Sequence, residues 1–533
     1  MLMAHLTVHL TPVAEGIGVT WRLDDVELED GAVLAQIVVE IAGTRTVGLD
    51  DAEVRARDAS GDLPLVATVE EEDGESWRRW RVGRRTSGSL TVSYLAVPSE
   101  DAASPGAPPI DLRREGEAGS GALKSFVALP PGPSDLAFVL RCDLAPGRTA
   151  AASSGEGADL ANGVRGTGLT ELDDVFLAYG DVGEQHHRDG NVSVWWLTPP
   201  PLEVEAFVER LGATYDVLVD TFAVPAAPYR VFLRSGEHRG ITASAHPASF
   251  VVAVHHEDPP SPAMLHETIA HELVHEWVHL DGLAAEVTWF VEGAADYYSL
   301  VVPHRHGLID DDALARAVKL AARECWASPL RGSSLAAARQ SPSDLWARRL
   351  PYGRGLFYLA DLDARLRAAT SGRTSVDDVV RTVVRRRGEG LQVEVTDWCA
   401  LVDAFLLGDE ASVLDAHVLT GRAVPSADCF GLVRRTVEVP VVDLGFAVET
   451  LVTRRVQGLV AGGPADRAGL RDGDAVELPT WRTLLGLGAG DTVELRLTRA
   501  GEPVVLRLPV GEQVVAIPQW GRTEDPADPP APR

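Results

Sequence analysis

The chain has 533 residues, and its 45% hydrophobic and 24% charged residues are ordinary globular values that exclude wholesale disorder. The 78 acidic residues outnumber the 49 basic ones, so the net charge of −29 argues against nucleic acid and anionic membranes as partners. No run of about 18 apolar residues occurs, and the start lacks a signal-peptide pattern, so we expect no membrane span and a cytoplasmic location. Nearly all basic residues are arginine, which is typical of a GC-rich bacterial genome.

The first 150 residues or so carry β patterns. Residues 89–97 alternate apolar and polar side chains, and residues 36–41 form a short β-branched run. A Pro- and Gly-rich stretch at residues 99–121 predicts a long loop, and the small side chains of residues 148–163 predict a linker between domains. The four cysteines are scattered without a CxxC pair, so we expect buried thiols in a reducing compartment.

The pattern becomes helical from about residue 165. Residues 202–218 repeat apolar positions at helix spacing, two strand-like runs follow at residues 229–233 and 249–254, and helical patterns then continue to about residue 420. A β pattern returns after Pro440, and the proline-rich end predicts a disordered tail. We therefore expect a multidomain α+β fold, with domains at residues 1–160, 161–438 and 439–515 and a tail at residues 516–533.

The most informative segment is an HExxH pattern formed by His271, Glu272 and His275. On a helix this pattern places two imidazoles one turn apart on the same face, where both can bind one Zn²⁺. Glu272 then lies beside the metal-bound water and can take its proton. The other nearby histidines lack this spacing around a glutamate, so we interpret them as surface or supporting groups: His255, His256, His266 and His279.

A second helical pattern begins near Thr288 and contains Glu292 and Asp296. A catalytic zinc usually has three protein ligands and one open position, and Glu292 can be the third ligand if the two helices pack antiparallel. Asp296 lies four residues further on the same face, where it can accept the free N–H of a ligating imidazole. The sequence therefore predicts one Zn²⁺ per chain, bound by His271, His275 and Glu292.

These segments resemble a known family. HExxH followed by EGxxD on the next helix is similar to the gluzincin arrangement of thermolysin-like zinc peptidases, and HELVHEW with TWFVEGAADYY resembles the glycyl aminopeptidase family. The resemblance implies a β-rich N-terminal domain, a mainly helical thermolysin-like catalytic domain and a C-terminal PDZ domain. It also implies a metallopeptidase, most nearly an aminopeptidase, whose partners are peptide or protein substrates. A peptide-binding or scaffold protein with negligible turnover is the alternative.

The resemblance continues in the PYGRG segment around Tyr352. In related aminopeptidases the tyrosine of such a segment donates its hydroxyl to the oxyanion, so the resemblance implies this role for Tyr352. The chemistry agrees, because a tetrahedral intermediate needs a hydrogen-bond donor opposite the metal. A tyrosine that merely packs in the core is the alternative interpretation.

An edge strand before the zinc helix departs from the family pattern. The family has a Gly-Leu-Glu-His-type strand there, whose acid can hold the amino group of the substrate. The best match in this chain places Ala245 where the acid stands and His246 after it, which implies that these two residues lie at the substrate. A second alignment uses Glu237 and His238 and keeps the acid, so aminopeptidase and endopeptidase activity both stay open.

The C-terminal region contains Leu444, Gly445 and Phe446 followed by a β run, and then GPADRAGLRDGD at residues 463–474. These segments resemble a PDZ domain. The resemblance implies that backbone N–H groups around residues 444–446 take the C-terminal carboxylate of a peptide while the peptide adds as a strand. A purely structural module that docks on the catalytic domain is the alternative.

Overall fold

The computed structural model describes residues 5–24, 26–49, 54–72, 74–98, 107–132, 135–188, 190–236, 241–256, 259–341, 344–426, 429–447, 450–479, 481–488, 490–499, 501–509 and 513–522. The chain forms two compact units: the N-terminal unit has Met1–Gly212 and Ala226–Leu265, and the C-terminal unit has Ala213–Pro225 and His266–Arg533. Neither predicted boundary, after residue 160 or after residue 438, coincides with this division. In the described part of the chain, no helix has both the length and the apolar character needed to cross a membrane.

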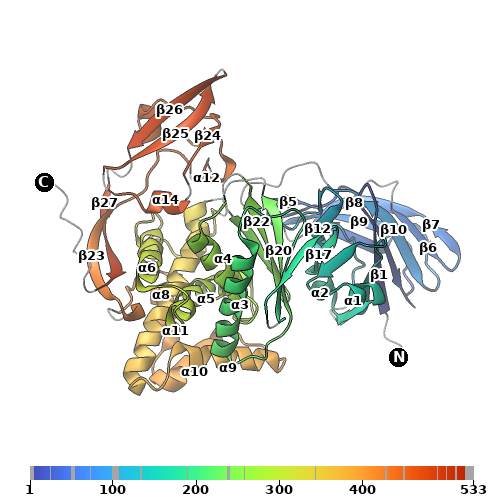
Figure 1. Cartoon of the computed structure of the whole chain (residues 1–533), viewed down its shortest axis with the longest axis horizontal. Helices are drawn as coiled ribbons and strands as arrows, with labels where there is room; N and C mark the ends of the chain where they lie inside the picture. Colours follow the sequence, from blue (N-terminus) through green and yellow to red (C-terminus); the bar gives the residue numbers. More distant parts are fainter. Residues whose placement is uncertain are drawn as a thin grey trace. The chain divides into compact units, whose positions relative to one another are not determined.

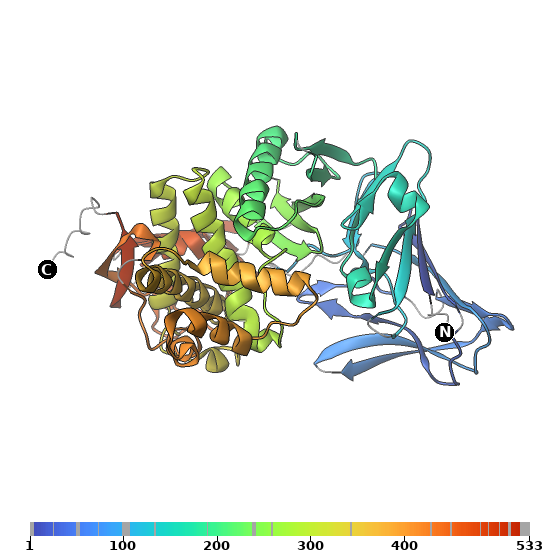
Figure 2. The same cartoon turned by 90° about the horizontal axis from the view of Figure 1, so that it is seen from below.

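The N-terminal unit begins with sheets that share one hydrophobic core (Figure 1, Figure 2). A seven-stranded sheet has the order β16 (Val164–Thr167), β13 (Ala137–Cys142), β1 (His5–Pro12), β2 (Ile17–Leu23), β10 (Leu90–Ala96), β6 (Arg55–Asp58) and β7 (Gly61–Leu63). A five-stranded sheet has the order β11 (Arg113–Glu115), β12 (Ala118–Ala122), β17 (Phe176–Gly180), β14 (Thr149–Ala152) and β15 (Gly155–Glu156). Strand β10 alternates buried and half-exposed residues, as its sequence predicts.

Smaller elements complete this region. A three-stranded sheet has the order β3 (Val33–Val38), β9 (Glu75–Val82) and β8 (Leu65–Glu72), and β4 (Glu40–Ile41) pairs with β5 (Thr44–Arg45). Two short helices are α1 (Ala158–Asn162) and α2 (Leu169–Asp173).

Two predictions for this region are wrong. Strands β11 and β12 form within the stretch predicted as a loop, of which residues 99–106 lie outside the described residues. The predicted linker at residues 148–163 folds into β14, β15 and α1, and Ala150, Ala151 and Ala152 are fully buried. Small side chains suit a closely packed strand as well as a flexible linker, so composition alone could not separate the two.

A second five-stranded sheet follows in the N-terminal unit, with the order β18 (Gly183–His186), β19 (Val192–Trp196), β20 (Tyr229–Gly236), β22 (Ser249–His255) and β21 (Ile241–His246). Strands β19, β20 and β22 are parallel to one another, while β21 is an antiparallel edge strand. The strands predicted at residues 229–233 and 249–254 are confirmed, and α3 (Val204–Phe222) confirms the predicted helix.

The C-terminal unit is mainly helical. Its longer helices are α5 (Ala284–Arg305), α6 (Asp311–Trp326), α8 (Leu345–Thr370), α9 (Val376–Gly388) and α10 (Val395–Leu406), and α4 (Pro262–Val274) ends within it. Two short helices are α7 (Leu335–Ala338) and α11 (Glu410–Leu414). All four cysteines of the chain are buried thiols, as predicted, and burial raises the pKa of Cys142 and Cys325 to about 12.

Helices α5 and α8 lie side by side (Figure 1). They touch at two glycines. A Cβ atom added to Gly355 of α8 would lie 1.9 Å from the carbonyl oxygen of Trp289 on α5. A Cβ atom added to Gly293 of α5 would lie 2.4 Å from the Cα atom of Gly355. Only glycine permits this approach, and it brings Glu292 of α5 and Tyr352 of α8 to the same region.

The C-terminal module, defined as residues 441–509, contains a three-stranded antiparallel sheet of β24 (Val476–Glu477), β25 (Thr492–Arg499) and β26 (Glu502–Pro509). Its helices are α12 (Thr450–Thr453), α13 (Pro464–Arg467) and α14 (Trp481–Leu485). The β run predicted after Phe446 is wrong, because α12 begins at Thr450 and the described residues between Phe446 and β24 form no strand. Instead, these residues follow turns and short helices.

A two-stranded ribbon flanks the C-terminal module. Strand β23 (Val433–Pro440) pairs antiparallel with β27 (Val514–Gly521). Trp520 of β27 is fully buried and lies against Trp326 and Phe357, with ring centroids 5.7 and 4.8 Å apart. The predicted tail boundary after residue 515 therefore falls inside a strand, and residues 523–533 lie outside the described residues.

Candidate metal centre

Helix α4 carries His271, the first histidine of the predicted metal-binding pair. It begins at Pro262, which suits the first helical position, and the hydroxyl of Ser261 accepts the N–H of Met264 at 3.2 Å. Within the C-terminal unit, Ile269 and Leu273 are fully buried on one face of the helix. His271 lies in the last turn, and His275 follows just after the helix ends at Val274.

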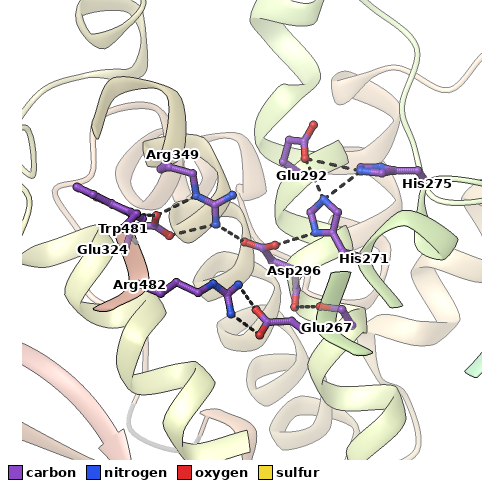
Figure 3. A network of polar contacts seen from close by, with 10 residues as sticks. Glu267, His271, His275, Glu292, Asp296, Glu324, Arg349, Trp481 and Arg482 are labelled. Carbon is purple, nitrogen blue, oxygen red and sulfur yellow. Dashed lines mark hydrogen bonds and ion pairs between the residues drawn. The ribbon is translucent and has the colours of Figure 1, made fainter. Parts of the chain in front are cut away.

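Three side chains converge in the C-terminal unit (Figure 3). The Nε2 atom of His271 lies 3.2 Å from Nε2 of His275 and 3.3 Å from Oε2 of Glu292. The third distance, from His275 Nε2 to Glu292 Oε2, is 3.7 Å. Tetrahedral zinc with bonds of roughly 2.0–2.1 Å places its ligand atoms about 3.3 Å apart, so these three atoms fit the ion. In the described ranges, this is the one cluster of three or more such side chains whose ligand atoms converge.

Asp296 supports this arrangement from the next turn of α5. Its Oδ1 atom lies 2.8 Å from Nδ1 of His271, which holds the proton on Nδ1 and leaves Nε2 for a metal. Its Oδ2 atom accepts a longer hydrogen bond of 3.4 Å from Arg349 of α8. Asp296 therefore has the geometry that its predicted role requires, and Arg349 donates to its other carboxylate oxygen.

Sequence reasoning missed the polar groups beyond Asp296 (Figure 3). Arg349 also donates to both carboxylate oxygens of Glu324 on α6, at 2.9 and 3.2 Å, and Trp481 of α14 donates to Glu324 at 2.7 Å. Arg482 of α14 forms a bidentate ion pair with Glu267 of α4. Of these residues, only Arg349 could have been placed near the site from the sequence, because it lies three residues before Tyr352 on the same helix.

The carboxylates around the two imidazoles favour one positive charge. Burial opposes a charge on His271, but hydrogen bonds to Asp296 and Glu292 outweigh it and raise the pKa of His271 to about 10. Burial and the charge on His271 lower the pKa of His275 to about 4. A cation is therefore stabilised where the three ligand atoms meet.

Glu272 and Tyr352 lie at this centre. Glu272 is half-buried, and burial raises its pKa to about 7, with a further contribution from the charge of Glu292. The Tyr352 ring stacks on His271 with a centroid distance of 6.1 Å, and the guanidinium of Arg349 lies 4.0 Å from its centroid. Burial raises the pKa of Tyr352, and nearby Glu292 raises it further, so the phenol keeps its proton.

A cavity adjoins Tyr352. Its volume is about 300 Å³. Helix α5 contributes Thr288 and Trp289 to the wall, and Leu335, Ala338 and Pro351 contribute apolar surface. The lining is therefore mainly apolar beside a polar centre, as in many ligand sites.

The predicted substrate residues lie on β21 of the N-terminal unit. Ala245 is exposed. His246 is 6% exposed, its Nδ1 atom lies 2.9 Å from the carbonyl oxygen of Asp174, and burial lowers its pKa to about 4. Glu237 and His238 of the second alignment lie outside the described residues.

The other histidines do not join the converging group. His266 is buried, and its Nε2 atom lies 3.1 Å from the hydroxyl of Thr214. His279 is half-buried, while His255 and His256 lie at the end of β22 and just after it. Their interpretation as surface or supporting groups stays a prediction, and His266 lies in the interior instead of at the surface.

The predicted PDZ loop lies at the start of the C-terminal module. Leu444 and Gly445 are buried and Phe446 is half-buried. The N–H of Gly445 donates to Oδ1 of Asp443 at 2.9 Å, and its carbonyl accepts the N–H of Val460 at 2.8 Å. One of the three amides expected to bind a carboxylate therefore already has an acceptor.

Comparison with known proteins supports the fold. No protein-family model matches the sequence, and a comparison with curated proteins finds no match. The aminopeptidase N family protein from Idiomarina loihiensis is similar over 96% of this chain and 97% of its own, with a TM-score of 0.67 and 16% identity. Yeast LTA4 hydrolase in complex with Bestatin is similar over 80% of this chain and 68% of its own, with a TM-score of 0.50 and 13% identity. The predicted mixed α+β fold, with a β-rich N-terminal region and a helical part, is confirmed.

Proposed function

We propose that this protein is a metallopeptidase that binds one zinc ion per chain and hydrolyses peptide bonds, with aminopeptidase as its nearest class. The convergence of His271, His275 and Glu292, with ligand atoms 3.2–3.7 Å apart, carries this proposal. Zinc, when bound, supplies a Lewis acid that polarises a carbonyl group and acidifies water. The likeness of fold to an aminopeptidase N family protein supports the same class.

Glu272 and Tyr352 supply the acid–base and electrostatic chemistry. Glu272 accepts a proton from the attacking water and passes it to the leaving amine, and a pKa raised to about 7 suits both transfers. Tyr352 donates its hydroxyl to the oxyanion that develops on the scissile carbonyl. The cavity beside Tyr352, whose wall is mainly apolar but includes Arg339, Arg348 and Arg349, has room for a side chain of the substrate.

The substitution Glu272→Gln tests this function. The amide cannot accept the proton, so turnover of a mixed peptide library should fall roughly 10²–10⁴-fold while the zinc content stays normal. Mass spectrometry of the products measures both rate and cleavage position. Wild-type turnover in the variant would contradict the role of Glu272, and no turnover in the wild type would favour a peptide-binding or scaffold protein.

The end of the substrate that is recognised needs its own test. An aminopeptidase must pair the α-ammonium of its substrate with a carboxylate, and Ala245 cannot supply one. This alanine favours an endopeptidase as the second candidate, whereas Glu237 would restore the acid. Each peptide is compared with its N-acetylated form, which an aminopeptidase should cleave far more slowly. Equal cleavage of both forms would establish the endopeptidase.

We propose in addition that the C-terminal module is a PDZ-like domain. Its support is the GPADRAGL segment, which forms α13 before the Gly473 turn, together with the three-stranded sheet. A C-terminal peptide at residues 444–446 would displace the bond from Gly445 to Asp443. Titration with a peptide library that has free or amidated C-termini tests this binding, because the amide removes the recognised charge.

A further inference from the structure

Helix α14 of the C-terminal module lies against helices α6 and α8. Trp481, its first residue, packs against Trp346 of α8 with ring centroids 4.3 Å apart. At the other end of α14, Arg323 of α6 donates to the carbonyl oxygens of Leu485 and Leu487 at 2.8 and 3.0 Å. Both ends of this short helix are therefore fixed to α6 and α8.

A continuous series of hydrogen bonds leads from α14 to a metal ligand (Figure 3). The indole N–H of Trp481 donates to Glu324 at 2.7 Å, and Arg349 donates to the same carboxylate at 2.9 Å. Arg349 then donates to Asp296, which accepts from His271 at 2.8 Å. Glu324 is 7% exposed, so it depends on these donors for the bonds it would otherwise make to water.

The position of Arg349 depends on how strongly each of its two carboxylate partners attracts it. Its guanidinium is shared between Glu324 and Asp296, and the bond to Asp296 is the longer one, at 3.4 Å against 2.9 Å. The Trp481 N–H donates a hydrogen bond to the Glu324 carboxylate and so stabilises part of its negative charge. Without this donor, Glu324 would attract Arg349 more strongly and draw it away from Asp296.

A second contact joins α14 to the zinc helix itself. Arg482 forms its bidentate ion pair with Glu267, which lies one helical turn before His271 on α4. The two side chains are 43% and 26% exposed, so the pair adds little to stability. Its bidentate geometry instead fixes the orientation of α4 relative to α14.

We infer that the C-terminal module completes the metal centre, and that Trp481 and Arg482 of α14 are positioning residues for the metal ligand His271. Trp481 acts through Glu324, Arg349 and Asp296, and Arg482 acts through Glu267 and the backbone of α4. The inference rests on the proposed zinc function. It assigns the module a role in the site that does not require a bound peptide.

The substitution Trp481→Phe tests the first contact, because it keeps an aromatic ring against Trp346 and removes only the N–H donor. Zinc Kd, measured in the full-length protein by competition with a chelator, should rise about 3–10-fold, less than the 10–100-fold typical of a direct partner of a ligand. Asp296→Asn provides that benchmark. In the Asp296→Asn background, Trp481→Phe should have no further effect, because its route to His271 is already cut. Equal losses in both backgrounds would overturn the route.

The substitution Arg482→Glu tests the second contact, since it places two carboxylates together. Zinc Kd should rise several-fold, and the swap Glu267→Arg with Arg482→Glu should restore it. Arg496→Ala is the matched control, because Arg496 pairs with Glu494 inside the module and should leave zinc affinity unchanged. If both Trp481→Phe and Arg482→Glu bound zinc with wild-type affinity, this inference would be overturned and the proposed function would stand. A wild-type protein that binds no zinc would overturn the proposed function as well.

Discussion

Helices α4 and α5 of the proposed zinc site and the C-terminal module reach the same polar network by different means. Helix α4 carries His271, His275 stands in the turn directly after its last residue Val274, and α5 carries Glu292 and Asp296 four residues apart on one face. The module reaches the network through Trp481, whose partner Glu324 lies 157 residues away in the sequence. Helix periodicity therefore fixes one part of the site, and the docking of two separate segments fixes the other.

This difference has a physical consequence. Side chains on one helix, or in the turn that directly continues it, keep their spacing as long as the helix forms, because the local backbone hydrogen bonds set the geometry. The contacts of α14 instead require that the module packs correctly on α6 and α8. We therefore expect substitution of a proposed metal ligand to abolish metal binding, and substitutions in the module to change zinc affinity by smaller factors.

The largest expected effect is that of His275→Ala. Loss of one of three ligands should raise zinc Kd at least about 10³-fold, beyond the range typical of supporting groups. His279→Ala is the matched control, because His279 lies near in sequence but outside the converging group, and it should keep its zinc. Metal analysis after dialysis measures both. Full zinc occupancy in His275→Ala would disprove the ligand assignment.

The effect of Tyr352→Phe should be smaller and fall mainly on catalysis. Removal of one oxyanion donor should lower kcat roughly 10²-fold. Zinc affinity should change by a smaller factor than kcat, because the Phe ring keeps its place beside His271 and only the hydroxyl contact with Glu292 is lost. Steady-state kinetics with a good peptide substrate gives kcat, and chelator competition gives the affinity. An unchanged kcat would show that Tyr352 only packs beside the site.

Acidity should change zinc affinity by a predictable amount. The pKa of His271 is raised to about 10, so near pH 7 its ring carries a proton that zinc must displace, whereas His275, with a pKa of about 4, carries none. Glu272, with a pKa of about 7, is already ionised above about pH 8, so one proton then leaves for each ion bound and zinc Kd should fall about tenfold for each unit of rising pH between about pH 8 and about pH 9. Chelator competition across this range measures the slope. A constant Kd would show that His271 is already neutral.

The sequence predicted the parts of the site that local spacing controls. The four-residue interval of His271 and His275 predicted that these two side chains lie together, as they do, and the strongly alternating β10 was predicted for the same reason. The contact between α14 and Glu324 has no such signal, because it depends on how distant segments pack. The prediction of a linker at residues 148–163 was wrong for another reason, because small side chains occur both in closely packed strands and in linkers.

The smallest effect on turnover is expected for the loop that the sequence singled out in the module. Gly445 has φ of +75°, and an added Cβ atom would lie 2.8 Å from the Cδ atom of Pro464. Gly445→Ala should therefore lower the stability of the module by about 2–4 kcal/mol, from backbone strain and overpacking together. Thermal unfolding measures the loss.

Gly473→Ala separates the two causes, because Gly473 has φ of +85° but open space where its Cβ atom would lie. It should cost only the strain, about 1–2 kcal/mol. Below the unfolding temperature, kcat of both variants should stay within about twofold of wild type, because α14 and its contacts with Glu324 and Glu267 are unchanged. If Gly445→Ala instead lowered kcat as much as Tyr352→Phe does, the loop itself would be coupled to the metal centre. The distinction between the loop and α14 within the module would then be wrong.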